Sequence, residues 1–291
     1  MRNLKRWRKV DGAGIDRVES FLRAAESSCV SACARFLRRD AKRDPVWFLT
    51  EKEDPYALLF YYKRLLFPIF LGRKNIPLPP FMRRFPLKIP IYALQGLRRD
   101  VETFAALIEP LGYRGAQSID YDLMNLDAGP FPLCFQAGPP GLVLRKPGVA
   151  DLEALFPLQA AYEREEVLPR GSVFNPAAAR LALEHTLAQQ HVLTAELDGR
   201  IVGKINTNAE AFSRYQIGGV YVLPQYRGQG IATRMTAELA RQLVAGNNKP
   251  DTARWGLTLF VKKSNHAARK IYRRVGFTIT AEYRIAYYRN A

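Results

Sequence analysis

The stretch VYVLPQYRGQGIATRMTAELARQLV, Val220 to Val244, constrains the fold of this chain more than any other part. Its first residues belong to an apolar run, Ile217 to Leu223, whose β-branched and aromatic residues predict a strand. Pro224 ends this strand, because proline offers no N–H to a sheet ladder. Beyond a short turn, apolar side chains recur at helical spacing from Ile231 to Leu243, which predicts a helix. The order is therefore strand, turn, helix.

The turn from Arg227 to Gly230 has the properties of an anion-binding site. Several N–H groups at the start of a helix lack an intrahelical partner, and the helix dipole is positive there. Gly228 and Gly230 allow a pyrophosphate to approach the backbone more closely than a Cβ would permit. A simple tight turn is the alternative. No G-x-x-x-x-G-K-[ST] run occurs, so a P-loop is excluded, and no G-x-G-x-x-G with a later acidic residue supports a dinucleotide fold.

A second stretch downstream repeats the order of strand, turn and helix. Trp255 to Val261 is a short apolar run that predicts a strand. Ser264 and Asn265 then offer a helix N-cap, and Ala267 to Val275 is predicted as a helix that ends at Gly276.

Together the two stretches resemble the GNAT superfamily of N-acetyltransferases. Val220-x-Val222, Pro224, then Arg227-x-x-Gly230-x-Ala232 is similar to the acetyl-CoA motif of that family. LFVKKSNHAARKIYRRVGF is similar to the motif that follows it, with Asn265, Tyr272 and the Gly276-Phe277 pair in the matching places. Two motifs in the right order and at the right distance identify the C-terminal half as a member of this family.

The resemblance implies acetyl-CoA as cofactor. Backbone groups of the strand are expected to hydrogen-bond the pantetheine arm, the N–H groups of the turn to hold the pyrophosphate, and the helix-capping asparagine to touch the CoA arm. The expected cofactor-binding residues are Val220, Tyr221, Val222, Arg227, Gly228, Gln229, Gly230, Ile231, Ala232, Thr233 and Asn265.

The expected catalytic residue is Tyr272, which would donate a proton to the departing thiolate; the alternative is a core tyrosine packed under the sheet. The general base is left open, because the positions where family members place an acidic residue are Phe260, Gly218 and Gly219 here. The remaining candidates are Glu210, His266, the cluster Glu163, Glu165 and Glu166, and an ordered water. No metal site is predicted.

The formal net charge of the chain is +17, spread over both halves. Such a field favours anionic partners: CoA, nucleic acid, acidic substrates or a membrane surface, with a basic solvated surface as the alternative. Cys29, Cys33 and Cys134 show no paired metal-ligand spacing, and free thiols fit a reducing cytoplasm. The basic N-terminus lacks an apolar h-region and no apolar run is long enough to span a bilayer, so a cytoplasmic protein without a membrane partner is expected.

The N-terminal half has the order of a GNAT domain but lacks its cofactor motif. A helix is predicted at Asp16 to Arg39, and at the expected place of the motif stands only LQGLRRD, Leu94 to Asp100. This half is predicted to be a degenerate GNAT-like domain, with an unrelated cap domain as the alternative. Its predicted strands are Val46–Thr50, Tyr56–Tyr62, Leu65–Leu71, Ile91–Gln95 and Tyr121–Leu126, and a second helix is predicted at Asp100–Leu111.

The C-terminal half supplies the rest of the family's element order. Its Asp198-Gly199 dipeptide is typical of a type I′ hairpin turn. The expected elements are strands at Leu142–Arg145, Val192–Leu197, Arg200–Asn206 and Ala281–Tyr288, and helices at Asp151–Glu165 and Pro176–Gln189. The fold class is α/β (α+β): two GNAT-like domains in tandem, each a mixed, mostly antiparallel sheet flanked by helices. The predicted ranges are 1–135 for the N-terminal domain, 136–141 for a linker and 142–291 for the N-acetyltransferase domain.

The resulting hypothesis is an acetyl-CoA-dependent N-acetyltransferase in which a primary amine attacks the thioester directly. The acceptor would be an amine of a small molecule or a peptide, whose identity the acceptor loops do not reveal. A non-catalytic acyl-CoA-binding or regulatory module is the alternative, because no general base is identified. Nucleic-acid binding as the sole function is not favoured by the two motifs. The oligomeric state and the role of the N-terminal half are left open.

Overall fold

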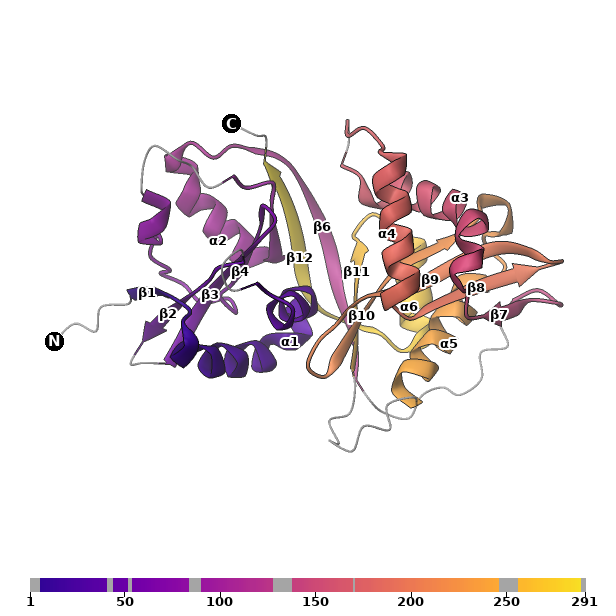
Figure 1. Ribbon diagram of the computed structural model, residues 1–291, viewed down its shortest axis with the longest axis horizontal. Coiled ribbons are helices and arrows are strands. Elements are labelled where there is room, and N and C mark those ends of the chain that lie inside the picture. Colours follow the sequence, from indigo (N-terminus) through magenta and orange to yellow (C-terminus); the bar gives the residue numbers. More distant parts are fainter. Residues whose placement is uncertain are drawn as a thin grey trace. The chain divides into compact units, whose positions relative to one another are not determined.

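The computed structural model describes residues 6–40, 44–51, 54–83, 90–127, 138–169, 171–245 and 256–288. Figure 1 shows the chain, which forms two compact units. The N-terminal unit contains Met1–Leu123, Phe260–Ser264 and Thr280–Ala291, and the second unit contains Met124–Leu259 and Asn265–Ile279. Cys134, Trp255 and positions 136 and 137 of the expected linker lie outside the described residues.

The N-terminal unit is a mixed sheet with a helix on each face. Its strands follow the order β1-β2-β3-β4-β5-β12-β6. From β1 to β12 in this order the neighbours are antiparallel except for the parallel pair β4 and β5. Its elements are β1 Arg6–Lys9, α1 Ile15–Leu37, β2 Val46–Glu51, β3 Asp54–Tyr62, β4 Leu65–Ile69, β5 Ala93–Leu97, α2 Arg98–Ile108, β6 Gly115–Leu126 and β12 Thr278–Tyr288.

Alternating side chains explain why these two helices take opposite faces. Leu59 and Leu66 pack in one buried cluster with Phe104 of α2. Phe67 points the other way, and the guanidinium of Arg35 on α1 lies 5.4 Å from its ring centroid. Because successive side chains of a strand face opposite sides, each apolar strand can bury both of its faces. Cys29 and Cys33 of α1 are buried free thiols, in agreement with the expectation of unpaired cysteines.

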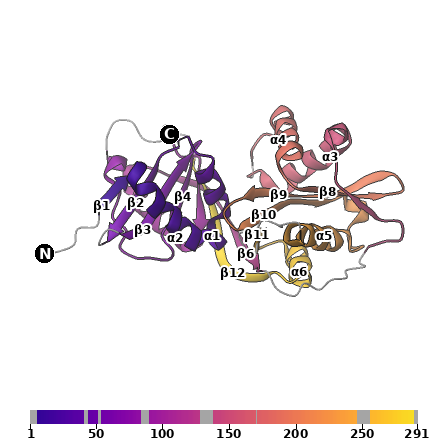
Figure 2. The same cartoon turned by 60° about the horizontal axis from the view of Figure 1, so that its bottom comes forward.

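The second unit is a sheet with a pair of helices on each face. Its strands follow the order β7-β8-β9-β10-β11, antiparallel except for β10 and β11. Figure 2 shows α3 and α4 on one face of this sheet and α5 and α6 on the other. Its elements are β7 Val143–Arg145, α3 Leu152–Tyr162, a π-helical turn Glu163–Val167, α4 Pro176–Gln189, β8 Val192–Leu197, β9 Arg200–Glu210, β10 Arg214–Val222, α5 Ile231–Ala245, β11 Gly256–Lys262 and α6 His266–Val275. The residues of β11 from Phe260 onward belong to the N-terminal unit.

The closing strand β12 forms where the sequence predicts a strand, and its neighbours in the sheet are β5 and β6. It pairs with β5 of the N-terminal unit, in a register that aligns Tyr283 with Leu97 and Tyr287 with Ala93. The order of elements along a chain does not specify which sheet edge a terminal strand joins, so the motif order alone could not place it. The predicted domain ranges, which end the second domain at residue 291, stay a prediction.

Within the described residues, none of the helices has the length and apolar character needed to cross a membrane.

Candidate functional site

A β-bulge interrupts β10 directly before the apolar residues expected to bind the cofactor. The β9–β10 register shifts between Gly218 and Tyr221, and Gly219 has φ +60°. A Cβ at Gly219 would lie 1.8 Å from Oδ1 of Asn206, so only glycine fits. A bulge bends its strand and increases the local twist. On the other side of β10, the described pairing with β11 ends at Ile217 and Leu259. The backbone beyond Ile217 is therefore not paired with β11 in this register.

The turn after β10 leads into the N-terminus of α5. Gly228 and Gly230 have φ +81° and +83°, the left-handed region that favours glycine. A Cβ at Gly228 would meet nothing within 4 Å, so its surroundings are open. The first helical bond of α5 runs from the N–H of Arg234 to the carbonyl of Gly230, at 3.1 Å. The N–H groups of Ile231, Ala232 and Thr233 precede that bond, as an anion site at a helix N-terminus requires.

Arg227 does not extend its side chain from the turn but folds it back along the sheet. Its Nε donates to the carbonyl of Val222 at 2.9 Å, and its terminal nitrogen lies 2.9 Å from Oε2 of Glu165. The hydroxyl of Tyr221 donates to Oε1 of the same carboxylate at 2.6 Å. Burial would raise the pKa of Glu165, but the hydrogen bonds from Tyr221 and Arg227 outweigh it, and the pKa is lowered. Tyr221 and Arg227, both predicted from the sequence, thus meet at a carboxylate of the π-helical turn.

Asn265 forms the expected cap of α6. Its Oδ1 accepts from the N–H of Ala268 at 3.0 Å, and its Nδ2 donates to Oε1 of Glu166 at 3.2 Å. Tyr272 lies near the C-terminal end of α6 and is buried, with its ring against Phe277 at a centroid distance of 6.2 Å. Within the described part of the chain, the hydroxyl of Tyr272 forms no hydrogen bond.

The Tyr272 hydroxyl stays protonated at neutral pH. Burial raises its pKa, and the neighbouring Tyr162 and Glu166 raise it further. Glu166 acts in the same way on Tyr162, whose pKa is raised first by burial. Of the carboxylates considered as general base, Glu166 is therefore the one beside both tyrosines and Asn265, whereas Glu163 accepts from Gln159 at 2.8 Å. Two residues of this acidic cluster, Glu165 and Glu166, therefore contact residues that the sequence predicts to bind the cofactor.

The remaining base candidates lie elsewhere. Glu210 ends β9, where it pairs in register with Tyr215. His266 is exposed in the first turn of α6 and contacts Arg269.

Sequence reasoning missed Lys204, a buried residue of β9. Its Nζ donates to the carbonyl of Gly219 and to Oδ1 of Asn206, both at 3.1 Å. It is 1% exposed, and burial lowers its pKa to about 7. The only sequence signal is parity: in an alternating strand, Lys204 shares a face with the apolar Val202.

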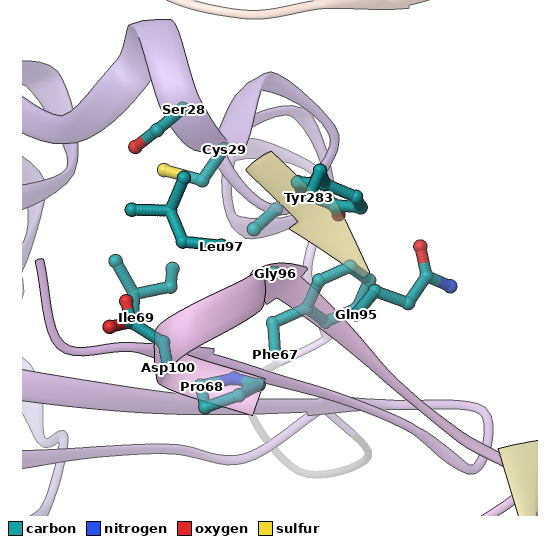
Figure 3. Close-up of a pocket in the computed structure, with 11 residues that line it drawn as sticks. Ser28, Cys29, Phe67, Pro68, Ile69, Gln95, Gly96, Leu97, Asp100 and Tyr283 are labelled. Atoms are coloured by element: carbon teal, nitrogen blue, oxygen red, sulfur yellow. The ribbon is translucent and has the colours of Figure 1, made fainter. Parts of the chain in front are cut away.

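The N-terminal unit also contains a pair of parallel strands, β4 and β5, and a carboxylate occupies the turn that follows β4. The β4–β5 pairing stops at Leu66 and Leu94. Beyond it lies a small, shallow pocket lined by strand residues and by Cys29 of α1. Figure 3 shows Asp100 at the edge of this pocket, next to Ile69. The carboxylate of Asp100 accepts from the backbone N–H groups of Phe70, Leu71 and Gly72 at 2.8 to 3.0 Å.

This carboxylate fills the turn that follows β4, which is the counterpart of the turn that follows β10. Burial raises the pKa of Asp100, and the three N–H bonds oppose that rise. The N–H groups that an incoming phosphate would need are therefore already engaged by the chain itself.

Comparison with known proteins finds the GNAT fold that the two sequence motifs predict. Residues 188–279 match the model of an acetyltransferase (GNAT) domain. A Drosophila protein of known structure is similar over 98% of this chain and 99% of that one, with a TM-score of 0.66 at 10% identity. A GCN5-related N-acetyltransferase from Sphaerobacter thermophilus is similar over 97% of this chain and 94% of its own, with a TM-score of 0.57 at 17% identity.

A tandem GNAT protein from the clavulanic acid biosynthesis pathway covers 97% of this chain and 98% of its own, with a TM-score of 0.57 at 12% identity. At such identities the likeness concerns the fold, which is that of two GNAT-like units in tandem. A comparison with curated proteins finds no sequence match.

Proposed function

The chain carries an acetyltransferase domain of the GNAT superfamily at residues 188–279, and from this premise we propose that it transfers the acetyl group of acetyl-CoA to a primary amine. The amine would attack the thioester directly and displace the CoA thiolate. The observation that carries the proposal is that the β10–β11 pairing ends at Ile217 and Leu259, while β10 continues to Val222. The turn after β10 then leads into the N-terminus of α5.

The two parts of this arrangement fit the two parts of the acyl-CoA molecule. On its β11 side the backbone of Val220 to Val222 has no strand partner in the described register, although Tyr221 and Val222 pair with β9 on the other side. That open side suits the amide groups of a pantetheine arm, which would add to β10 as a strand does. The turn from Arg227 to Thr233 suits the pyrophosphate, because its glycines admit a close approach and its helix N-terminus favours negative charge. Asn265, which caps α6, would contact the CoA arm.

Acetyl transfer needs a proton donor for the departing thiolate, and Tyr272 suits that role. Its raised pKa keeps the phenol protonated, and within the described residues its hydroxyl has no competing hydrogen bond. The amine must also lose a proton, and Glu166, beside Tyr162 and Asn265, is the acidic group best situated to accept it directly or through water.

The test is turnover with a panel of amines. The full chain is incubated with acetyl-CoA and polyamines, peptides or aminoglycosides, and both free thiol and the acetylated product are measured. Stoichiometric release of thiol and acetylamine supports the proposal. Thiol release without an acetylated amine, or no release with any amine class, contradicts it.

A non-catalytic acyl-CoA-binding module is a second candidate, favoured by one observation. The strand positions where relatives of the family place an acidic residue hold Phe260, Gly218 and Gly219 in this chain. Calorimetry that finds tight acetyl-CoA binding, together with an absence of turnover across the panel, supports the binding module instead.

A further inference from the structure

Lys204 lies on β9 next to the β-bulge of β10 and hydrogen-bonds both the bulge backbone and Asn206. Its Nζ donates to the carbonyl of Gly219 and to Oδ1 of Asn206, each at 3.1 Å. The ring of Tyr162 lies 5.0 Å from the same nitrogen, a cation–π distance. The N–H of Gly219 donates to the hydroxyl of Tyr162 at 3.3 Å. Both backbone polar groups of Gly219 are therefore fixed by side chains.

No carboxylate of the described residues forms an ion pair with Lys204. The groups that face it are Tyr162 and Glu163 from the end of α3, Tyr221 opposite it on β10, and Asn206 on its own strand. Glu163 favours the charged amine only at a distance, so burial dominates and lowers the pKa of Lys204 to about 7. An apolar side chain would fill this position without that penalty.

Lys204 can influence the reacting atoms indirectly, through the peptide group that it hydrogen-bonds. The carbonyl that accepts from Lys204 belongs to the peptide that joins Gly219 to Val220. In a planar trans peptide, the N–H points opposite to the C=O. The N–H of Val220 therefore points away from the ammonium, and the cation strengthens it as a donor by polarising the whole peptide.

We propose that Lys204 is a positioning residue for acyl transfer, whose ammonium fixes and polarises the Gly219–Val220 peptide so that the N–H of Val220 stabilises the oxyanion that develops on the thioester. This inference rests on the proposed acetyl transfer. A preorganised backbone donor of this kind acts mainly in the transition state, where negative charge appears on the carbonyl oxygen. Lys204 thus governs the rate more than the affinity for acetyl-CoA.

The experiment uses the full chain and acetyl-CoA labelled with ¹³C at the carbonyl, without any amine. Isotope-edited infrared difference spectra report the carbonyl stretch of the bound thioester, which falls as the carbonyl is polarised. Wild type is compared with Lys204→Met, which removes the charge and the donor, and with Lys204→Gln, which keeps a neutral donor. The control is Lys146→Met, which alters an exposed lysine of the same unit.

We expect the stretch to rise in Lys204→Met, to rise less in Lys204→Gln, and to be unchanged in Lys146→Met. In wild type it should rise as the pH increases through about 7, where Lys204 loses its proton, and Lys204→Met should lack this step. With the best amine, kcat for Lys204→Met should fall by about 10- to 100-fold with little change in KM for acetyl-CoA.

Three results would overturn the inference. The first is a Lys204→Met protein that binds acetyl-CoA with a wild-type carbonyl stretch. The second is a large loss of stability in both Lys204 variants, which would make the residue structural. The third is wild-type protein that does not bind acetyl-CoA at all by calorimetry, and only this result would also refute the proposed function.

Discussion

Lys204 is the residue at which stability and the candidate site conflict most directly. Its pKa falls from 10.5 to about 7 on folding, and a pKa unit corresponds to about 1.4 kcal/mol. The charged form therefore costs the fold on the order of 5 kcal/mol when it is fully present, below pH 7. A group that weakens the fold and adjoins a strained bulge is a sign of function.

We therefore predict that Lys204→Met stabilises the protein near pH 6, by roughly 2 kcal/mol or more, since the lost hydrogen bonds offset part of the gain. The folded-state pKa lies below the unfolded one, so the unfolded chain binds more protons between pH 7 and pH 10.5 and wild-type stability rises with pH there. The variant should lack that rise. Urea unfolding near pH 6 and pH 9 measures both effects, and a variant weaker than wild type at pH 6 contradicts the prediction.

Burial shifts the pKa of Tyr272 in the opposite direction to that of Lys204. It raises the pKa, so the phenol holds its proton throughout the neutral range. We predict that Tyr272→Phe lowers kcat by about 10²- to 10⁴-fold, because general acid catalysis is worth that much, with little change in KM for acetyl-CoA. The edge contact of the ring with Phe277 is kept by phenylalanine, so the fold should be retained. Steady-state kinetics decide it: a wild-type kcat would make Tyr272 a packed aromatic and nothing more.

Among the elements, the turn before α5 carries the clearest expectation. Gly230→Asp should abolish acetyl-CoA binding, because it adds bulk and negative charge where the pyrophosphate is expected. Gly171→Asp is a matched control: its φ of +79° is close to the +83° of Gly230, and a Cβ there meets nothing within 4 Å. Both variants carry the same backbone strain, so only the site differs. Calorimetry on folded proteins that shows equal affinity for both would refute the assignment.

The corresponding turn of the N-terminal unit depends on Asp100. We predict that Asp100→Ala destabilises this unit by about 2–4 kcal/mol, because three backbone N–H groups lose their acceptor and all three bonds lie between 2.8 and 3.0 Å. The control is Glu102→Ala, which removes exposed ion pairs with Arg98 and Arg284 and should change little. Urea unfolding and amide exchange at Phe70 to Gly72 measure the effect. Equal losses in the two variants would contradict it.

The sequence predicted the elements whose cause is local. The glycine turn, the Asn265 cap and the β8–β9 hairpin depend on residues within a few positions of one another, and all three form as expected. The fold class of two GNAT-like units in tandem was likewise confirmed, because motif order and element order together specify it.

Features that depend on distant contacts were not predicted. The sequence places Asp100 only at the end of LQGLRRD and predicts no role for it, because its partners at Phe70 to Gly72 lie about 30 residues upstream. The role of Lys204 depends on Gly219 and Tyr162, neither of which adjoins it in sequence. The π-helical turn at Glu163–Val167 continues a helix that the sequence predicted only to Glu165, and its contacts with Tyr221 and Asn265 cross between elements.

For the whole molecule, the two units share a topology and differ in their turns. In the second unit, the turn after β10 leads into the free N-terminus of α5. In the N-terminal unit, the turn after β4 precedes no α-helix in the described residues until α2, and Asp100 occupies its N–H groups. The net charge of +17 attracts anions to the whole chain and does not discriminate between the units. Selection between them must therefore come from the turns.

We predict that acetyl-CoA binds the second unit alone. Hydrogen exchange with and without acetyl-CoA should show new protection at residues 218–233 and 265–272, because backbone groups there would bond the ligand, and none at residues 65–72 or 93–100. Gly230→Asp should lose the protection, whereas Asp100→Ala should keep it at residues 218–233, since that carboxylate belongs to the other turn. Protection that appears at residues 65–72 in wild type, with none at 218–233, would assign the cofactor to the N-terminal unit and overturn both the site and the role of Asp100 as its internal anion.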